Sequence, residues 1–213
     1  MSAGLPWAEM VTAWAVLGAN ILSPGPNVFT TIAIALGSGR RAALAVIPAI
    51  GIGMLVWATL ALTGARIVFT AFPWAQPALT ALGGTLLIVF AIRYARRALA
   101  WSAAAGEGRV MTPRAAFAMT LAVLAANPKA LTTWLVLVSI FPAGEATPAA
   151  IAIMVAGSVA VGCAGHTAYA LAFSTRPAAA AFARAGRAIT AGVAVFFAIL
   201  GTTLLAEVAG ALA

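Results

Sequence analysis

The sequence has no aspartate, four glutamates, one histidine and one cysteine among its 213 residues. A single cysteine excludes an intrachain disulfide, and so few Cys and His side chains exclude a metal site built from them. An enzyme needs a nucleophile, an acid or a base in a fixed constellation. Because no acidic residue lies in the middle of an apolar segment, we expect no enzyme and no metal site.

Charge of either sign is scarce. Charged residues make up 8% of the chain and hydrophobic residues 64%, with a mean hydropathy of +1.08. Soluble domains carry about 25% charged residues, so this chain has too little polar surface to face water all round. The composition predicts an all-α integral membrane protein. The net charge of +8 would suggest nucleic acid in a soluble protein. Here the bases lie between apolar runs, so we expect a lipid bilayer as the partner and no nucleic acid.

Six segments are long and apolar enough to span a bilayer, which takes about 20 residues. The first is interrupted at Ser23-Pro24-Gly25-Pro26-Asn27 and the fourth at Asn127-Pro128. We therefore predict six transmembrane helices, of which helices 1 and 4 are broken. The segments run over about Trp7–Leu36, Ala43–Val68, Ala78–Tyr94, Ala115–Ile140, Pro148–Phe173 and Ala188–Glu207.

The basic residues between these segments predict the orientation. Only Arg66 falls on one side, whereas ten arginines fall on the other: Arg40, Arg41, Arg93, Arg96, Arg97, Arg109, Arg114, Arg176, Arg184 and Arg187. Cytoplasmic loops carry the excess of Lys and Arg. We expect both termini outside, the loop around Glu107 in the cytoplasm, and a multi-pass location in a bacterial inner membrane.

An internal repeat relates the two breaks. At an offset of 102 residues, Pro26 aligns with Pro128, and Thr30 and Thr31 align with Thr132 and Thr133. Each motif interrupts the first helix of a three-helix half. Since three is odd, the second half must be inverted in the membrane. We predict one membrane domain over 1–213, built from two inverted three-helix repeats at about 1–100 and 113–213.

Broken helices at corresponding points of inverted repeats are a pointer to a transporter binding site. The N-terminal ends of the half-helices favour a carboxylate, and the carbonyl ends suit an ammonium. We therefore predict a small zwitterionic substrate held near the breaks by Pro24, Gly25, Pro26, Asn27, Asn127, Pro128 and Lys129. The alternative is a pair of plain proline kinks.

Single polar residues within the apolar segments have two interpretations each. Lys129 either has a functional role, contacting the substrate carboxylate or carrying the coupling proton, or plugs the carbonyls of a broken helix. His166 either relays protons or packs between helices. The hydroxyls of four threonines either line the cavity or bond to their own helix; these are Thr30, Thr31, Thr132 and Thr133.

The two break motifs resemble the PGPN and NPK signatures of the LysE/RhtB family of amino-acid exporters. The chain also has Gly39-Arg40-Arg41 and the glycine-rich Ile50-Gly51-Ile52-Gly53 at the family's positions. It departs from the family in the third segment, where Leu79-Thr80 replaces a Leu-Lys pair. The resemblance implies proton-driven export of amino acids or related metabolites, without an organic cofactor.

We predict a secondary active exporter of a neutral amino acid or a similar zwitterion, working by proton-coupled alternating access. A cationic substrate would need an acidic partner, and no mid-segment acid is present. The alternatives are a channel or structural membrane subunit, or an exporter of a metabolite that is not an amino acid. The short chain is compatible with a homodimer.

Overall fold

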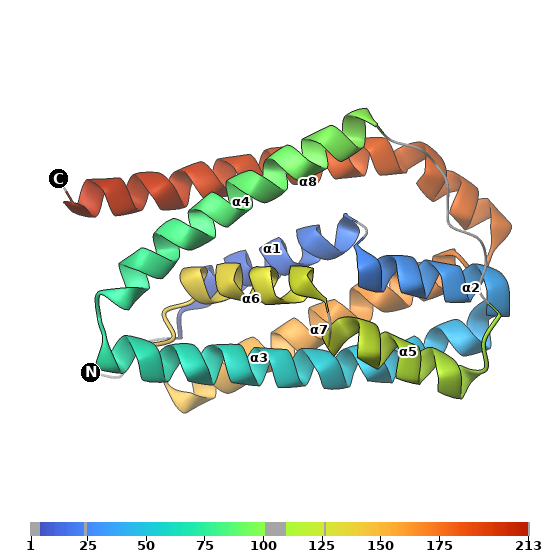
Figure 1. The fold of residues 1–213 in the computed structure, drawn as a ribbon, viewed down its shortest axis with the longest axis horizontal. Helices are drawn as coiled ribbons and strands as arrows, with labels where there is room; N and C mark the ends of the chain where they lie inside the picture. Colours follow the sequence, from blue (N-terminus) through green and yellow to red (C-terminus); the bar gives the residue numbers. More distant parts are fainter. Residues whose placement is uncertain (1–4, 24, 101–109, 126, 213) are drawn as a thin grey trace.

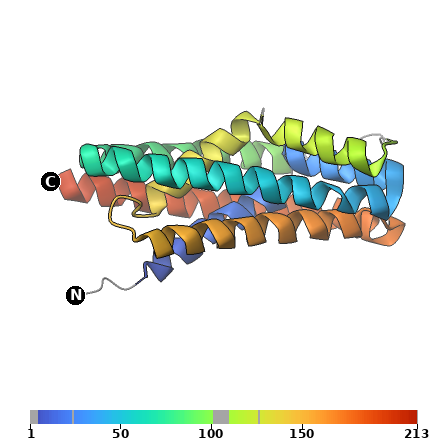
Figure 2. The ribbon, with the colours of Figure 1, turned by 90° about the horizontal axis from the view of Figure 1, so that it is seen from below.

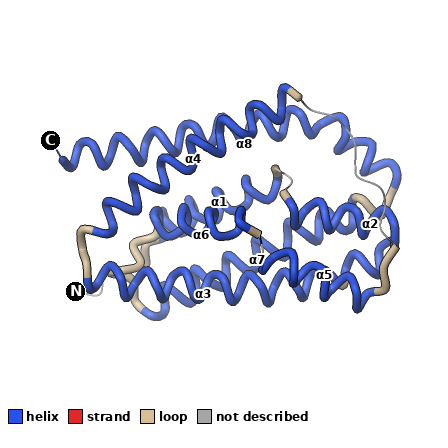
Figure 3. The backbone as a smooth tube through the Cα atoms, in the orientation of Figure 1, coloured by secondary structure: helices blue, strands red, loops and turns tan. Residues whose placement is uncertain are grey.

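The computed structural model describes residues 5–23, 25–100, 110–125 and 127–212. Every regular element within these ranges is a helix, and no strand occurs among them (Figures 1 and 3). The prediction of an all-α architecture is therefore confirmed. In chain order the helices are α1 (Trp7–Leu22), α2 (Pro26–Leu44), α3 (Val46–Ala71), α4 (Ala75–Leu99), α5 (Pro113–Ala125), α6 (Pro128–Ile140), α7 (Pro148–Ala172) and α8 (Arg176–Leu212).

The two predicted interruptions are both present. The first lies between α1 and α2, and the second between α5 and α6. Pro26 and Pro128 are each the first residue of the helix that follows the break. Proline is favoured there because the first N–H of a helix has no partner within the helix. Pro24 and Ala126 lie outside the described residues.

Two helices extend furthest beyond the predicted segments. α2 continues past Leu36 to Leu44 through a kink at Gly39, where φ is +72°, a value that favours glycine. α8 begins at Arg176, well before the apolar segment starts at Ala188. The predicted ends were wrong because hydropathy detects only the apolar part of a helix, and both extensions are basic.

Four stretches of the described chain are long and apolar enough to cross a membrane: Val46–Ala71, Ala75–Leu99, Pro148–Ala172 and Arg184–Gly210. α1 and α5 are apolar but shorter. Large apolar side chains also lie on the outside, and Leu60, Ile67 and Ile199 are each more than 60% exposed. Such exposed apolar surface favours contact with lipid.

Of the four half-helices, α1, α2 and α6 lie between two pairs of long helices, and α5 lies alongside α3 (Figure 1). α4 crosses α8 on one side, and α3 lies against α7 on the other. The partners in both pairs run in opposite directions, and the two chain ends lie at the same end of the molecule (Figures 1 and 2). The described glutamates Glu9, Glu145 and Glu207 belong to that end. The basic ends of α2 and α4 and the basic starts of α5 and α8 lie at the opposite end.

Contacts between the halves are reciprocal. α1 packs on α7 while α5 packs on α3, and α2 packs on α5 and α7 while α6 packs on α1 and α3. The ends of the first half-helices are seated in the same way. A Cβ on Gly165 of α7 would lie 2.7 Å from Ile21, and a Cβ on Gly53 of α3 would lie 2.1 Å from Leu124. Each break is thus held against a glycine of the other half.

The reciprocity is incomplete. α4 packs on α6, but among the described residues no comparable contact joins α8 to α2. A pocket lined by the start of α2, by α4 and by the start of α6 is described below.

Candidate functional site

Lys129 links the two breaks. It lies in the first turn of α6, where the side chain of the N-cap residue Asn127 accepts a hydrogen bond from the Lys129 backbone N–H at 2.9 Å. Asparagine is among the strongest N-cap residues because its oxygen satisfies an N–H that the helix leaves unpaired. The cap fixes the start of α6, and with it the position from which the lysine side chain extends.

The Lys129 ammonium reaches the far break. Nζ donates to the carbonyl oxygens of Asn20 at 3.0 Å and Ser23 at 3.1 Å, at the carbonyl end of α1. The hydroxyl of Tyr169, on α7, donates to the carbonyl of Leu22 at 2.8 Å. The last carbonyls of a helix have no partner within it. Here two side chains of the second half satisfy them, so the ammonium is placed as the plug interpretation of Lys129 requires.

A buried network continues from Asn20. Its side-chain Nδ2 donates to Thr133 Oγ1 at 2.6 Å, and Tyr94 Oη donates to its Oδ1 at 2.6 Å. Thr133 in turn donates to the carbonyl oxygen of Lys129, and the Lys129 ammonium lies 5.4 Å from the centre of the Tyr94 ring. The network therefore joins α1, α4 and α6. Sequence analysis missed Asn20, Tyr94 and Tyr169; the available signal was an amide near the end of an otherwise apolar helix.

Gly25 leaves room for the lysine. A Cβ at Gly25 would lie 2.9 Å from both Cδ and Nζ of Lys129. Real Cβ atoms almost never come so close, so any larger residue would displace the lysine side chain. The glycine between the two prolines of the first break is thus required by the packing of Lys129.

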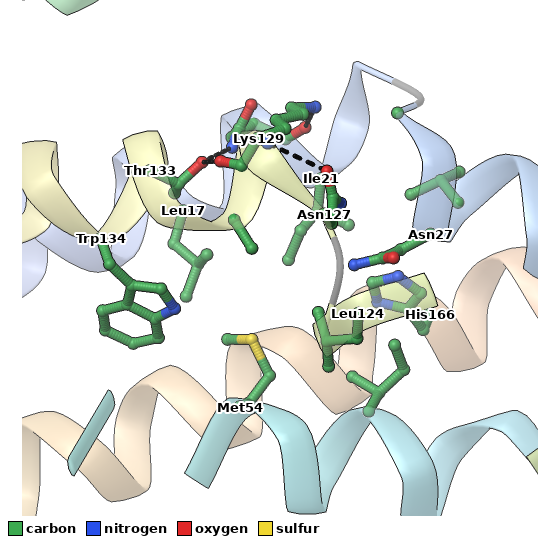
Figure 4. Close-up of a pocket in the computed structure, with 15 residues that line it drawn as sticks. Leu17, Ile21, Asn27, Met54, Leu124, Asn127, Lys129, Thr133, Trp134 and His166 are labelled. Carbon is green, nitrogen blue, oxygen red and sulfur yellow. Dashed lines mark hydrogen bonds between the residues drawn. The ribbon is translucent and has the colours of Figure 1, made fainter. Parts of the chain in front are cut away.

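A small cavity lies between the breaks and α3 and α7 (Figure 4). It measures about 60 Å³, and its lining includes Asn27, Asn127, Lys129, Thr133 and His166. Pockets for small molecules typically exceed about 300 Å³, so this cavity has room for a few water molecules only. In the conformation described here this cavity is therefore too small for an amino acid.

Two polar atoms in this cavity lining have no hydrogen-bond partner among the described residues. They are Oδ1 of Asn27 and Nε2 of His166. The other ring nitrogen of His166, Nδ1, lies 2.9 Å from the carbonyl of Gly162 on its own helix. His166 is only 4% exposed, so a hydrogen-bond partner for Nε2 would have to come from the cavity.

A larger pocket of about 600 Å³ opens on the other side of the same residues. It shares Gly25, Asn127 and Lys129 with the small cavity, and Pro26, Phe90, Arg93, Tyr94, Arg97 and Thr132 complete its lining. Its walls come from the starts of α2 and α6 and the basic end of α4. Lys129 lines both spaces, so it lies at the boundary between them.

The four threonines bond to their own helices. Thr30 and Thr31 donate to the carbonyls of Pro26 and Asn27, and Thr132 and Thr133 both donate to the carbonyl of Lys129. Thr132 lines the large pocket and Thr133 the small cavity, whereas Thr30 and Thr31 line neither. Of the predicted substrate residues, Gly25, Pro26, Asn27, Asn127 and Lys129 line one or both spaces. Pro24 lies outside the described residues, and only the backbone of Pro128 is described.

Within the described ranges, no three His, Cys, Asp or Glu side chains come together as metal ligands would. The site is instead made of amide, hydroxyl, ammonium and guanidinium groups around two broken helices. Groups of these kinds can form hydrogen bonds with the charged and polar parts of a solute.

Comparison with known proteins gives one family. The model of the LysE type translocator matches residues 19–208. Among curated proteins, the chain is 30% identical over 114 residues to proteins called threonine efflux protein in Escherichia coli strain K12 and in Escherichia coli O157:H7. The match covers 52% of this chain and 55% of those relatives, so the chain spans about half of their length. No solved structure matches.

Proposed function

This chain belongs to the LysE type translocator family, and we propose that it exports a neutral amino acid, or a similar small zwitterion, across the inner membrane by proton-coupled alternating access. Its family and its apolar helices make it a multi-pass membrane protein and a transporter. The substrate, the proton coupling, the inner membrane and the external termini are parts of the proposal, and a homodimer remains a prediction.

One observation carries the proposal: Lys129 of the second half closes the broken helix of the first half. Its two hydrogen bonds to the end of α1 join residues more than 100 positions apart, at the place where both helix interruptions meet. Irregular backbone at membrane depth is tolerated where it is buried in protein or lines a cavity. Binding sites of secondary transporters lie at such breaks, between the two repeats.

The reciprocal contacts of the halves support six spans in two inverted repeats. In this arrangement α1 with α2 counts as one broken span and α5 with α6 as another. Among the remaining spans, α3 then corresponds to α7 and α4 to α8, and the two helices of each pair run in opposite directions. The unmatched contact between α4 and α6 makes the two sides unequal. Alternating access requires such an inequality, because only one side is open at a time.

The position of the Lys129 ammonium suggests how this residue takes part. Its ammonium occupies the carbonyl end of α1, which is where a substrate ammonium would bind. We propose that substrate entry or a change in protonation moves Lys129 away from these carbonyls and so loosens the contact between the halves. His166 is the second candidate for the proton, since its open nitrogen faces the cavity on the other side of the break.

The lack of acidic groups around the breaks favours a neutral amino acid. None of the described residues that line either space is acidic, so a second positive charge on the substrate would have no partner there. The relatives in Escherichia coli are called threonine efflux proteins, which makes threonine the first substrate to examine.

The test is counterflow in proteoliposomes loaded with unlabelled amino acid. Saturable uptake of labelled threonine or another neutral amino acid, absent from empty liposomes, is the expected result. Preferential exchange of lysine or arginine would refute the neutral substrate. Flux that does not saturate and shows no counterflow would mean a channel, because a channel has no alternating-access cycle.

A further inference from the structure

The large pocket beside Lys129 is positively charged on several sides. Arg93 and Arg97 lie one helical turn apart on α4, so they share a face, and Lys129 faces them from α6. None of the described lining residues is acidic. The three described glutamates belong to helices and a loop at the opposite end of the molecule. The local field therefore favours an anion in this pocket.

Backbone groups add to this field. The pocket lining includes Gly25 and Pro26 at the start of α2 and Asn127 at the start of α6. Helix starts carry partial positive charge and unpaired N–H groups. Asn127 caps α6 with its side chain, whereas no side chain caps α2. The start of α2 accordingly retains N–H groups that suit a negatively charged oxygen.

The guanidinium of Arg97 is held in place. It lies 4.8 Å from the centre of the Phe29 ring, which belongs to α2, and the side chain is half-buried. Arginine keeps its charge in proteins and presents paired N–H groups that match the two oxygens of a carboxylate. A positioned arginine at the edge of two helix starts is a suitable receptor for that group.

We infer that this pocket receives the carboxylate of the substrate, and that the carboxylate, not the ammonium, is the part the protein requires. The substrate class is then small monocarboxylates, including those without an amino group. The carbonyls of α1 that would take an ammonium are already bonded to Lys129, whereas the pocket presents a positive lining to an incoming anion. The inference rests on the proposed function only where it concerns transport.

Binding is tested without transport, on the purified protein in neutral detergent. The probes are two fragments of threonine: 3-hydroxybutyrate, which keeps the carboxylate, and 1-amino-2-propanol, which keeps the amine. We expect 3-hydroxybutyrate to raise the unfolding temperature in a saturable way and the amine to have no effect. In R97Q the apparent dissociation constant for 3-hydroxybutyrate should rise at least about tenfold, since the charge-assisted paired bonds are lost.

Two further variants keep the result interpretable. R97K retains the charge but not the paired geometry, so its loss should be intermediate. R96Q removes an equal charge from the same end of α4, at an exposed residue that does not line the pocket, and should bind like the wild type. Equal losses in R96Q and R97Q, or stabilisation by the amine instead of the acid, would overturn the inference.

A lipid phosphate also presents negatively charged oxygens to an arginine, so a further measurement distinguishes lipid from carboxylate. Stabilisation by phosphatidylglycerol that R97Q removes, without any response to 3-hydroxybutyrate, would assign the pocket to lipid and overturn the inference. In proteoliposomes, 3-hydroxybutyrate should compete with threonine counterflow. If no amino acid is transported but 3-hydroxybutyrate still binds through Arg97, the proposed substrate is wrong and the carboxylate site stands.

Discussion

The ammonium of Lys129 lies 3.1 Å from the carbonyl oxygen of Ser23, so the first turn of α6 is tied to the end of α1. The same ammonium also donates a hydrogen bond to the carbonyl oxygen of Asn20. The charge of a lysine inside an apolar helix bundle is thereby matched to carbonyls that the broken helix leaves unpaired. The break and the lysine stabilise each other, and the next two predictions follow from this.

Replacing Lys129 with methionine should destabilise the protein by about 1–3 kcal/mol, since it leaves two carbonyl oxygens without donors. The change also removes the cost of burying the ammonium, which keeps the loss moderate. Unfolding in mixed SDS micelles measures the free energy. The matched variant Arg96→Met alters an exposed base and should differ little from wild type. Equal stability of Lys129→Met and wild type would contradict the role of the tie.

Replacing Gly25 with alanine should act through the same lysine. The added Cβ would lie 2.9 Å from the Lys129 Nζ, and overpacking of this kind costs about 1–3 kcal/mol. In a Lys129→Ala background the cost should fall, because the contacts with Cδ and Nζ are both gone and the two sites are coupled. The same unfolding assay on both single variants and the double variant measures this.

Gly64 supplies the control for that cycle. A Cβ there meets no atom within 4 Å, so Gly64→Ala should be neutral or stabilising by up to about 1 kcal/mol. Strict additivity of Gly25→Ala and Lys129→Ala would show that the glycine does not make room for the lysine.

The end of α5 should depend on Gly53 in a similar way. A Cβ at Gly53 would lie 2.1 Å from Leu124, so Gly53→Ala should reduce stability by about 1–3 kcal/mol. Leu124→Ala alone should cost about 2–5 kcal/mol through the cavity it creates. The double variant should be more stable than the sum of the two changes predicts, since the new methyl group fills part of that space. If the stability losses of the two single variants simply add in the double variant, Leu124 does not contact Gly53.

The positions of the breaks could be predicted because their cause is local. Pro26 and Pro128 end or start a helix whatever surrounds them, and both do so here. The plug interpretation of Lys129 named carbonyls of a broken helix, but not which helix. The actual partners, Asn20 and Ser23, depend on how α1 and α6 pack, and no pattern in the sequence contains that information.

The same distinction holds for the other polar residues. Bonds from the threonines to their own helix turns follow from spacing and were among the two interpretations given. Tyr94 and Tyr169 could not be predicted because their hydroxyl partners lie on a different helix in each case. The basic pocket was missed for a similar reason. Arg93 and Arg97 indicated orientation, and only the fold brings them beside Lys129.

Orientation is tested with single cysteines in a Cys163→Ala background, since Cys163 is the only native cysteine. Glu145→Cys lies in the exposed turn before α7, and Thr175→Cys lies in the exposed turn before α8. The excess of arginine at the end of the molecule where α8 begins predicts that this end is cytoplasmic. A membrane-impermeant maleimide should therefore label the Glu145→Cys variant in intact cells and the Thr175→Cys variant only after permeabilisation. The reverse pattern would invert the proposed direction of entry.

Proton coupling through His166 is tested by separating exchange from driven transport. Its Nε2 has no hydrogen-bond partner among the described residues, and the residue lines the small cavity. Asn27 and Lys129 line the same cavity, but they also belong to the breaks. His166→Asn should keep threonine counterflow within about twofold of wild type but reduce accumulation driven by a pH gradient at least about tenfold, because a titratable ring is replaced by an amide. Ser158→Ala, a buried change two turns earlier on α7, serves as the control and should reduce neither activity selectively. A parallel loss of both activities in His166→Asn would make the histidine a packing residue, and no loss of driven transport would leave Lys129 or the substrate itself as the group that carries the proton.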